Sequence, residues 1–316
     1  MNVLITGAAG FIGSNVCKEF LKQGWNIYGL DNFDDFYDTK LKKERISELD
    51  KHKNFFFFNI DICNIKNLKV KNFDLMINLA AQAGVRLPQD LHFKYNHSNV
   101  DGFKHFLDFS NDINCHNLLY ASSSSVYSSN GQIPYQENQK LYKPSSKYGE
   151  TKLENERIAE NFALETNSKI IGLRFFTVYG PIGRPDMAYY NFTKRILRNE
   201  EIILFNNGKT SRDMTYIDDI VEGILLAAKH LEKEEIIHEI FNLGNEKPIR
   251  THRLVSEIEK EFKKSALIKY ISEQNEVKIT KADCTKAKSV LGYSPKTPFK
   301  KGIKRFFNWF RKYYGV

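Results

Sequence analysis

The chain has 316 residues, of which 41% are hydrophobic and 27% are charged, so it can fold around one large core or two unequal lobes. A formal charge of +9 arises from 47 basic and 38 acidic residues spread along the whole chain. The interior basic residues do not cluster with aromatic residues, which argues against nucleic-acid binding. We interpret the charge as a solubilising surface, part of which could face a polyanionic ligand.

The sequence contains no uninterrupted apolar stretch of the ~18 residues that a membrane helix needs, so we expect no membrane insertion. The N-terminus has neither a basic start nor the apolar core of a signal peptide, and we expect a cytoplasmic protein. The four cysteines form no CxxC pair and the eight histidines form no HExxH motif. We therefore expect reduced thiols, without a disulfide framework or a metal site.

The first half of the chain alternates short apolar runs with helical patterns, which predicts a parallel sheet covered on both faces. Strands are expected at Asn2–Thr6, Asn26–Leu30, Phe55–Asn59, Leu75–Leu79, Leu118–Ala121 and Lys169–Phe175. Helices are expected at Phe11–Gln23, Lys40–Leu49, Asn99–Phe109 and Lys147–Leu164. This series predicts the α/β class, with a doubly wound parallel sheet of the Rossmann type.

The pattern changes near Thr177, where prolines and glycines indicate an irregular loop before a helix at about Met187–Arg198. We place the Rossmann domain at residues 1–176 and a smaller α/β substrate-binding lobe at residues 177–316. Two later segments could return to the sheet, so the first domain would also receive chain from about residues 214–243. These segments are Tyr216–Lys233 and Ile240–Leu243.

The last helix, expected at Phe299–Tyr313, combines an apolar stripe with basic residues on its other faces. The stripe has the spacing i, i+3, i+4 and i+7 and consists of Ile303, Phe306, Phe307 and Phe310. A basic aromatic helix could lie on a membrane surface. The core-like spacing instead favours a helix that docks its stripe on the smaller lobe.

The segment TGAAGFIG, from Thr6 to Gly13, lies between the first strand and the first helix. Gly7 can form the tight turn, Gly10 leaves room for a pyrophosphate, and Gly13 lets the helix pack closely on the strand. Phosphates would then meet the free N–H groups and the positive end of the helix dipole. This context predicts a dinucleotide-binding loop.

Asp31 ends the second strand, 18 residues after Gly13. A carboxylate there can accept hydrogen bonds from both ribose hydroxyls and would repel the 2′-phosphate of NADP, so NAD is the predicted cofactor. Asp61, which follows the third strand, is a weaker candidate for the adenine side. The expected cofactor contacts are Gly7, Gly10, Phe11, Ile12, Gly13, Asp31, Asn32, Asp61, Ile62, Leu79, Ala80, Ala81, Tyr148 and Lys152.

Tyr148 and Lys152 are four residues apart on a predicted helix, so their side chains share one face. A nearby ammonium favours the phenolate, and we expect Lys152 to lower the pKa of Tyr148 from ~10 toward the working pH. Such a pair can take a hydroxyl proton while a hydride leaves the same carbon. Four serines, Ser122–Ser125, follow the fifth strand where a cofactor would lie, and they can hydrogen-bond a sugar hydroxyl.

These motifs together resemble the extended short-chain dehydrogenase/reductase family. The matching segments include LAAQAGVR (Leu79–Arg86), YASSSSVY (Tyr120–Tyr127), RFFTVYGP (Arg174–Pro181), GRPDM (Gly183–Met187) and RDMTYIDD (Arg212–Asp219). Within that family, AAQAGVR combined with the FFTVYGP and GRPDM segments is most similar to the UDP-glucuronate 4-epimerases. The resemblance implies NAD-dependent C4 epimerisation of a UDP-sugar through a 4-keto intermediate, with UDP-glucuronate as the favoured substrate and UDP-galacturonate as its product.

The resemblance also implies roles for individual residues. Ser123, Tyr148 and Lys152 fall on the catalytic positions of the family. Thr177 falls where the family contacts the diphosphate region, and Arg212 falls where a basic residue binds the UDP phosphates. The remaining implied substrate contacts are Ser124 beside the catalytic serine, Arg184 for the sugar carboxylate, and Arg86 as the next candidate for that carboxylate.

Other activities remain open at this point. UDP-glucose or UDP-N-acetylhexosamine could be the substrate, and related enzymes dehydrate or decarboxylate the same kind of keto intermediate. Those reactions typically use a glutamate just before the Val-Tyr pair, where this chain has Ser124 and Ser125, so epimerisation is favoured. A non-catalytic NAD(H)-binding protein is the alternative from another class. The presence of Ser123, Tyr148 and Lys152 argues against it.

We also expect a homodimer, because related enzymes pair the helices that correspond to Asn99–Ile113 and Lys147–Thr166. The first of these helices has an apolar side that we expect the sheet to leave partly uncovered. That side consists of Val100, Phe103, Phe106 and Leu107.

Overall fold

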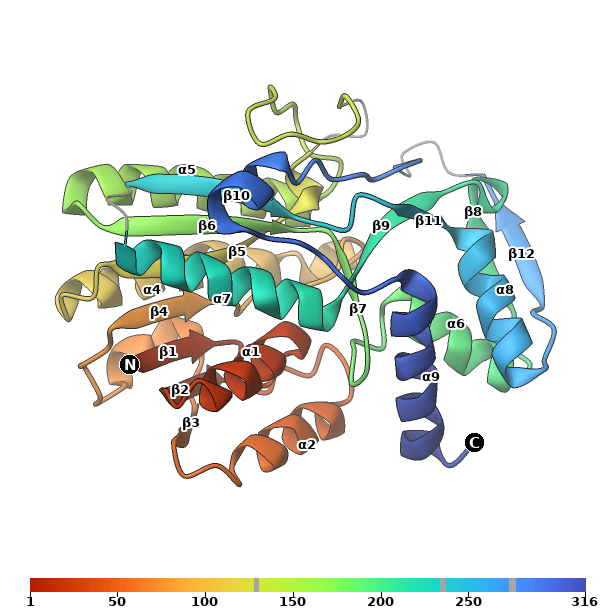
Figure 1. Cartoon of the computed structure of the whole chain (residues 1–316), viewed down its shortest axis with the longest axis horizontal. Helices are drawn as coiled ribbons and strands as arrows, with labels where there is room; N and C mark the ends of the chain where they lie inside the picture. Colours follow the sequence, from red (N-terminus) through yellow and green to blue (C-terminus); the bar gives the residue numbers. More distant parts are fainter. Residues whose placement is uncertain (128–130, 234–236, 273–276) are drawn as a thin grey trace.

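A computed structural model of the chain describes residues 1–127, 131–233, 237–272 and 277–316. The centre of the structure is a seven-stranded parallel sheet in the order β10-β6-β5-β4-β1-β2-β3 (Figure 1). Its strands are β1 (Asn2–Thr6), β2 (Asn26–Asp31), β3 (Phe55–Asn59), β4 (Leu75–Asn78), β5 (Asn117–Ser123), β6 (Lys169–Phe175) and β10 (His238–Leu243). The predicted Rossmann-type sheet is therefore confirmed.

The central strands are apolar on both faces because helices cover the sheet from both sides. Val3, Leu4 and Ile5 of β1 are fully buried, and Val3 lies between Ile27 of β2 and Leu75 of β4. Strand order reverses at β1, which has β2 on one side and β4 on the other. In open α/β sheets such a reversal creates a crevice at the carboxyl ends of the strands.

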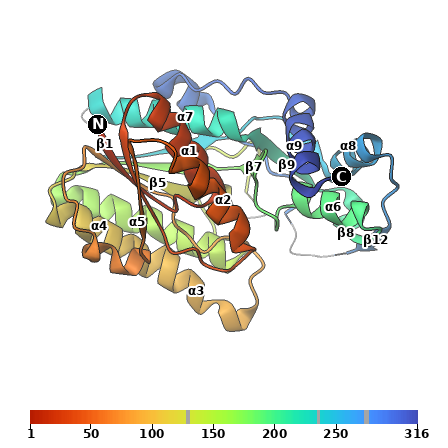
Figure 2. The ribbon, with the colours of Figure 1, turned by 90° about the horizontal axis from the view of Figure 1, so that it is seen from below.

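The helices pack in two layers, with α1, α2 and α7 on one face of the sheet and α4 and α5 on the other (Figure 2). Their bounds are α1 (Phe11–Lys22), α2 (Thr39–Leu49), α7 (Ile217–Lys233), α4 (Gly102–Asp112) and α5 (Lys147–Thr166). A short helix α3 (Phe93–Tyr95) precedes α4. Short 3₁₀ or π turns complete the set: η1 (Ile62–Asn67), η2 (Gln89–Leu91), η3 (Asn96–Asp101), η4 (Ser124–Val126), η5 (Asn206–Gly208) and η6 (Ala287–Leu291).

The apolar side of α4 belongs to the core of a single chain. Phe103 and Phe106 are fully buried and Leu107 is 2% exposed, within a cluster that includes residues of β1, β4 and β5. The expectation that the sheet leaves this side partly uncovered is therefore wrong for these three residues. Only Val100, one turn earlier, is half-buried.

A second group of elements lies beyond the carboxyl ends of the central strands (Figure 1). Its strands form two small sheets: β11 (Pro248–Arg250), β9 (Ser211–Tyr216) and β7 (Thr177–Tyr179) in one, and β12 (Ile268–Ile271) with β8 (Ile202–Phe205) in the other. Its helices are α6 (Ala188–Leu197), α8 (Thr251–Phe262) and α9 (Phe299–Tyr314). Between β9 and β11 the chain returns to the central sheet, where β10 pairs in parallel with β6.

The stripe on α9 docks against this lobe, as its spacing predicts. Ile303, Phe306, Phe307 and Phe310 are all buried. The ring of Phe306 lies edge-on to Tyr189 of α6, with 4.7 Å between centroids, and Phe307 lies edge-on to Phe262 of α8. Across the described ranges, no helix has the length and apolar character that crossing a membrane would require.

Candidate active site

A cleft of about 740 Å³ lies between the carboxyl ends of the central strands and the lobe. This volume is within the range of ~300–1,000 Å³ that is usual for small-molecule sites. The cleft brings together residues from segments that are far apart in sequence, from Gly7 to Thr280. Apart from Asp61, every residue expected in the site lines it: Gly7, Gly10, Phe11, Ile12, Gly13, Asp31, Asn32, Ile62, Leu79, Ala80, Ala81, Arg86, Ser123, Ser124, Tyr148, Lys152, Thr177, Arg184 and Arg212.

The glycine loop has the shape that a phosphate-binding turn requires. Gly7 adopts a left-handed conformation with φ 71°, and a Cβ added to it would lie 2.7 Å from the backbone nitrogen of Ala80. A Cβ on Gly13 would lie 2.1 Å from the Gly7 carbonyl oxygen. The first turn of α1 carries no acidic side chain. Its free N–H groups and dipole can therefore hold an anion.

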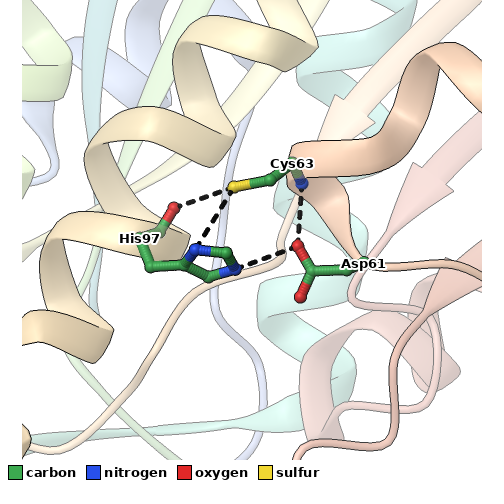
Figure 3. A group of neighbouring side chains, drawn as sticks. All are labelled: Asp61, Cys63 and His97. Atoms are coloured by element: carbon green, nitrogen blue, oxygen red, sulfur yellow. Dashed lines mark hydrogen bonds and ion pairs between the residues drawn. The ribbon is translucent and has the colours of Figure 1, made fainter.

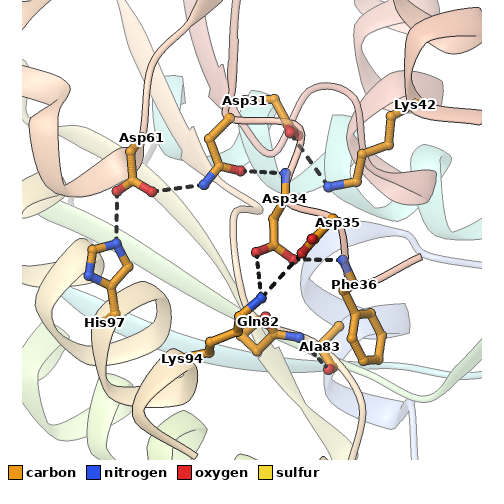
Figure 4. Close-up of polar contacts among 11 residues, drawn as sticks. Asp31, Asp34, Asp35, Phe36, Lys42, Asp61, Gln82, Ala83, Lys94 and His97 are labelled. Carbon is orange, nitrogen blue, oxygen red and sulfur yellow. Dashed lines mark hydrogen bonds and ion pairs between the residues drawn. The ribbon is translucent and has the colours of Figure 1, made fainter. Parts of the chain in front are cut away.

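Asp31 ends β2 beside this loop and is 7% exposed. Its Oδ2 accepts a hydrogen bond from the Ala9 N–H at 3.1 Å, and its Oδ1 accepts one from the Phe33 N–H at 2.9 Å. The Nζ of Lys42, which also lines the cleft, lies 3.7 Å from Oδ1 (Figure 4). The carboxylate is thus held in place by backbone donors and a cation from α2. Motif spacing alone did not indicate Lys42.

Asp61 does not line the cleft, although its neighbour Ile62 does. Its carboxylate accepts hydrogen bonds from Asn32 Nδ2 at 2.8 Å and from the Cys63 N–H at 2.9 Å. The Nε2 of His97 lies 3.1 Å from Asp61 Oδ1 (Figures 3 and 4). Because His97 belongs to η3, this contact connects η3 to Asp61. Asp61 is therefore connected to the cleft through its hydrogen bond with Asn32, which does line it.

Asp61, Cys63 and His97 lie close enough together to be candidate metal ligands, a grouping that the spacing of the cysteines and histidines did not indicate. The thiol sulfur of Cys63 is 3.7 Å from His97 Nδ1 and also donates to the His97 carbonyl (Figure 3). Burial, together with the Asp61 carboxylate, raises the pKa of the Cys63 thiol to about 11. Hydrogen bonds thus already link all three side chains.

The rim of the cleft is closed by contacts between the loop after β2 and α3. Lys94 Nζ lies 3.1 Å from Asp34 Oδ2 and 3.4 Å from Asp35 Oδ1 (Figure 4). The ring of Phe36 packs so closely on Gly84 that an added Cβ would lie 3.0 Å from it. The segments on either side of the crevice are therefore in contact at this rim.

The serine run and α5 meet at the floor of the cleft. Ser123 is the last residue of β5, and Tyr148 lies in the first turn of α5. The helix begins here because the Ser146 side chain accepts a hydrogen bond from the Gly149 N–H at 3.1 Å, which is a typical N-cap. Ser123 lies close enough to Tyr148 to lower the pKa of the phenol. The two groups expected to handle the hydroxyl proton therefore act on each other in this structure.

Lys152 lies beside Tyr148 and is anchored to the end of β5. Its Nζ donates a hydrogen bond to the Ala121 carbonyl at 2.8 Å and lies 5.8 Å from the centroid of the Tyr148 ring. Burial raises the pKa of Tyr148, and only the Arg184 charge and the bond to Ser123 lower it. Burial also lowers the pKa of Lys152 to about 8. The lowering of the tyrosine pKa by Lys152 stays a prediction, and in this structure burial opposes the charged form of both groups.

A buried ion pair lies behind the serine run. Arg174 of β6 donates from Nε and Nη2 to the two carboxylate oxygens of Glu156, both at 2.8 Å. Ser122 donates to the same carboxylate, and Arg174 Nη1 donates to the Tyr127 hydroxyl at 2.8 Å. The pair thus fixes the end of β5 against α5 and β6. Two features of the sequence could have indicated this ion pair. Glu156 lies four residues after Lys152 and so on the same face of the helix, and Arg174 is a single arginine in an apolar strand.

The lobe supplies several of the expected substrate residues. Thr177 begins β7, and Arg212 of β9 donates to the Val277 carbonyl at 2.8 Å. The guanidinium of Arg86 stacks on the ring of Phe205, 4.0 Å from its centroid. Such stacking fixes the plane of an arginine while leaving its charge at the surface of the cleft.

Arg184 lies on the loop between β7 and α6. Its Nε and Nη2 donate to the two oxygens of Asp186, with 3.0 Å from Nε to Oδ1. Its charge is close enough to Tyr148 to lower the pKa of that residue. Arg184 therefore has an acidic partner in its own loop, Asp186 of the same GRPDM segment, and its charge also acts on the expected catalytic tyrosine.

Residues 3–244 match the model of the NAD dependent epimerase/dehydratase family. The chain belongs to this family. UDP-glucuronate 4-epimerase 4 of Arabidopsis thaliana is 40% identical, over 99% of this chain and 76% of that protein. UDP-glucuronate 4-epimerase of Thermodesulfobacterium geofontis is 39% identical, over 97% of this chain and 95% of that protein.

Among solved structures, the UDP-glucuronic acid 4-epimerase from Bacillus cereus in complex with UDP-glucuronic acid and NAD is similar to this chain. The two share a TM-score of 0.91 and 32% sequence identity, over 99% of this chain and all of that one. The resemblance inferred from the motifs, the epimerase class and the NAD cofactor are thus confirmed. The chain is an NAD-dependent epimerase with an extended short-chain dehydrogenase fold.

Proposed function

We propose that this enzyme interconverts UDP-glucuronate and UDP-galacturonate by epimerisation at C4. The observation that carries the proposal is the arrangement of Ser123, Tyr148 and Arg184 around one cleft. This arrangement combines a hydroxyl pair for proton transfer with a guanidinium for a carboxylate. The names of the Arabidopsis, Thermodesulfobacterium and Bacillus relatives support the same substrate.

The cofactor contacts follow from the shape of the sheet edge. The Gly7–Gly13 loop and the start of α1 would hold the diphosphate of NAD, Asp31 would accept hydrogen bonds from its ribose, and Leu79–Ala81 of the cleft lining would contact the rest of the cofactor. NAD, when bound, accepts a hydride from C4 of the sugar and returns it. Asp61 contributes by orienting Asn32.

Proton transfer is assigned to the pair at the end of β5. Tyr148 removes the C4 hydroxyl proton as the hydride leaves, and it returns a proton when the hydride comes back to the other face. Ser123 hydrogen-bonds the same sugar oxygen and lowers the pKa of Tyr148. Lys152 holds the floor of the site through the Ala121 carbonyl. The 4-keto sugar turns between the two transfers, with no net oxidation.

The lobe holds the rest of the substrate. Thr177 and Arg212 bind the diphosphate of UDP, and Ser124 contacts the sugar. Arg184 binds the sugar carboxylate, because its planar fork can engage both oxygens. Arg86 is the alternative residue for that carboxylate. In this structure Nε and Nη2 of Arg184 donate to the Asp186 carboxylate. This contact supports the proposal that the same guanidinium can bind the carboxylate of a sugar acid.

The homodimer is part of the same proposal. A groove between η3 and α5 supports a contact between two copies at these helices, and it is lined by a few apolar residues such as Val100 and Leu153 among charged ones such as Lys147, Glu150 and Arg157. The apolar contribution of the proposed contact comes from this outer groove and not from the buried side of α4. Light scattering at micromolar concentration tests the dimer, and a monomeric mass would contradict it.

The function itself is tested by incubating the enzyme separately with UDP-glucuronate, UDP-glucose and UDP-N-acetylglucosamine and identifying the products by NMR. We expect the C4 epimer from UDP-glucuronate and much slower change of the other two sugars. Absorbance of the bound cofactor reports transient reduction during turnover. Fast epimerisation of UDP-glucose with none of UDP-glucuronate would overturn the assignment of the substrate.

A further inference from the structure

Arg45 of α2 is a buried arginine outside the lining of the cleft. It is 3% exposed, and within the described residues no carboxylate pairs with it. Its Nη1 donates to the Ala9 carbonyl at 2.8 Å and to the Tyr37 hydroxyl at 2.7 Å. Its Nη2 donates to the carbonyls of Ile182 at 2.7 Å and Gly183 at 3.1 Å. One guanidinium therefore holds backbone oxygens from two segments that are more than 170 residues apart.

The two segments have different functions. Ala9 lies in the glycine loop, where the diphosphate of the dinucleotide binds. Ile182 and Gly183 lie in the loop that carries Arg184 two residues after Ile182. The side chain of Arg45 thus joins the cofactor wall of the cleft to the substrate wall, although α2 itself belongs to neither loop.

The loop that Arg45 holds has an unfavourable conformation. Ile182 has φ 54°, in the left-handed region that β-branched residues strongly disfavour. The Arg45 hydrogen bond at 2.7 Å goes to the carbonyl of this same residue. Gly183 is confined as well, because an added Cβ would lie 1.7 Å from the Tyr189 hydroxyl oxygen. The surroundings of this loop therefore impose its shape, and strained backbone of this kind is typical of functional sites.

The charge of Arg45 is only partly compensated. Carbonyl and hydroxyl dipoles surround it, and its Nε is buried without a hydrogen-bond partner. A buried cation without an anion is costly, so negative charge brought near it stabilises it. The anionic diphosphate that the glycine loop binds supplies such charge beside Ala9. Binding of the cofactor and retention of Arg45 in its position should therefore favour each other.

We propose that Arg45 is a positioning residue that couples cofactor binding to the shape of the loop carrying Arg184. With NAD in place, Arg45 holds the left-handed turn at Ile182 and so aims the Arg184 fork into the cleft. Its effect on uronate recognition rests on the proposed function of Arg184. The coupling between the two loops does not.

Hydrogen exchange tests the coupling without any substrate. Amides of residues 180–187 are followed by mass spectrometry in wild type and Arg45→Lys, with and without NAD. We expect NAD to slow exchange in the wild-type loop. In Arg45→Lys the NAD-bound loop should exchange about tenfold faster than the wild-type loop, since lysine cannot hold both segments with a fork. Lys43→Met, which removes an exposed charge from the same helix, should behave like wild type. Equal, NAD-dependent protection in wild type and Arg45→Lys would overturn the proposal.

Ligand binding separates a positioning role from a merely structural one. Affinities of UDP-glucuronate and UDP-glucose are measured by calorimetry on NAD-loaded Tyr148→Phe, which binds without turnover. Adding Arg45→Lys should weaken UDP-glucuronate about tenfold and leave UDP-glucose unchanged, because only the uronate uses the Arg184 fork. In an Arg184→Ala background, Arg45→Lys should have no further effect. Equal weakening of both sugars would contradict the positioning role.

The outcomes also separate this inference from the proposed function. If wild type shows no preference for UDP-glucuronate over UDP-glucose, the substrate assignment fails, while the exchange experiment still decides whether Arg45 couples the loops. If Arg45→Lys does not fold, Tyr37→Phe removes one of the four acceptors of the guanidinium. It should show a smaller increase of exchange in residues 180–187, and no increase there would overturn the coupling.

Discussion

Arg184 and Asp186 form a two-point ion pair within one loop, with Nε and Nη2 of the arginine on the two carboxylate oxygens. The arginine fork is therefore already arranged for a carboxylate before a sugar acid arrives. A uronate can reach it only by displacing or sharing Asp186. Such exchange of one carboxylate for another would favour sugar acids over neutral sugars, since a neutral sugar offers nothing to replace the displaced charge.

Arg184 should also determine the fate of the keto intermediate. Oxidation of glucuronate at C4 gives a β-keto acid, which loses CO₂ when the breaking bond stands perpendicular to the carbonyl plane. We expect Arg184→Ala to raise the KM for UDP-glucuronate by at least about tenfold, since charge-assisted hydrogen bonds typically contribute ~1.5–3 kcal/mol. The fraction of decarboxylated UDP-4-keto-pentose, read by NMR, should rise. Arg184→Lys should rescue only partly, because it restores the charge without the fork.

If Arg184→Ala changes neither the affinity nor the product ratio, the carboxylate is bound elsewhere. The same two measurements on Arg86→Ala would then test the alternative residue, whose guanidinium stacks on Phe205 in the cleft.

Tyr148→Phe should keep the fold and NAD binding and lose nearly all turnover, because it removes only the proton-transferring hydroxyl. Circular dichroism and retained NAD serve as controls for folding. Turnover by this variant near the wild-type rate would contradict the assignment.

The pH dependence should reveal the environment of Tyr148. Burial raises its pKa, so turnover should increase with pH as the phenol ionises. Ser123 lowers that pKa, and Ser123→Ala should therefore move the rising limb of the kcat–pH profile to higher pH. Ser125→Ala is the matched control, since it removes a hydroxyl from the same turn but keeps the backbone N–H that donates to Ser123. A limb that stays in place in Ser123→Ala would show that Ser123 does not act on the phenol.

Lys152 should destabilise the nucleotide-free protein at neutral pH. It is 1% exposed, and burial lowers its pKa from 10.5 to about 8. Below pH 8 the lysine is protonated in both the folded and the unfolded state, so the full cost of burying its charge is present. Between about pH 8 and 10.5 the folded state loses the proton first, and that cost declines. We expect Lys152→Met to raise the free energy of unfolding at pH 7 by up to roughly 3 kcal/mol.

This gain should shrink toward pH 10, which urea unfolding at the two pH values can measure. Stability equal to wild type at pH 7 and pH 10 would show that the lysine is neutral or solvated in the folded protein.

Glu156→Gln should destabilise the fold. The variant leaves the Arg174 guanidinium buried without its carboxylate, and breaking a buried ion pair typically costs ~3–5 kcal/mol. Glu154→Gln breaks an exposed pair with Arg157 on the same helix and should cost at most about 1 kcal/mol. Urea denaturation of both variants tests the difference, and equal stabilities would refute a structural role for the Glu156–Arg174 pair.

The central fold was predictable because the strands of the parallel sheet are short, mostly apolar runs between turns or helices, and β1, β4 and β6 are almost wholly buried. β1, β3 and β6 have the predicted bounds, and the other predicted strands differ by a few residues. The short strands β7, β9 and β11 were not individually predicted. They contain 3 to 6 residues each and pair with strands distant in sequence, so tertiary packing and not local pattern defines them.

The composition of the site was predictable where motifs follow strand ends, since parallel strands end at one edge of the sheet. Its electrostatics were not. The pKa values of Tyr148 and Lys152 depend on how deeply the folded chain buries them, which their spacing on a helix does not specify. The roles of Arg45 and Asp186 were missed for a related reason. Asp186 lies inside the GRPDM segment, but the segment does not specify that its carboxylate pairs with Arg184. No motif marks Arg45, and its partners in the substrate loop lie more than 130 residues away.

β10 is the last strand of the central sheet to be synthesised, well after β6, the strand with which it pairs. Residues Ile170–Phe175 of β6 are buried in the finished protein, but β10 that covers their open edge begins only at His238. The nascent chain must therefore extend by about 60 residues, or roughly 3–12 s at 5–20 residues per second, with this edge unpaired. An uncovered apolar edge invites pairing with another chain. The interval between β6 and β10 is thus a period in which this edge of a growing chain is open to pairing with another chain.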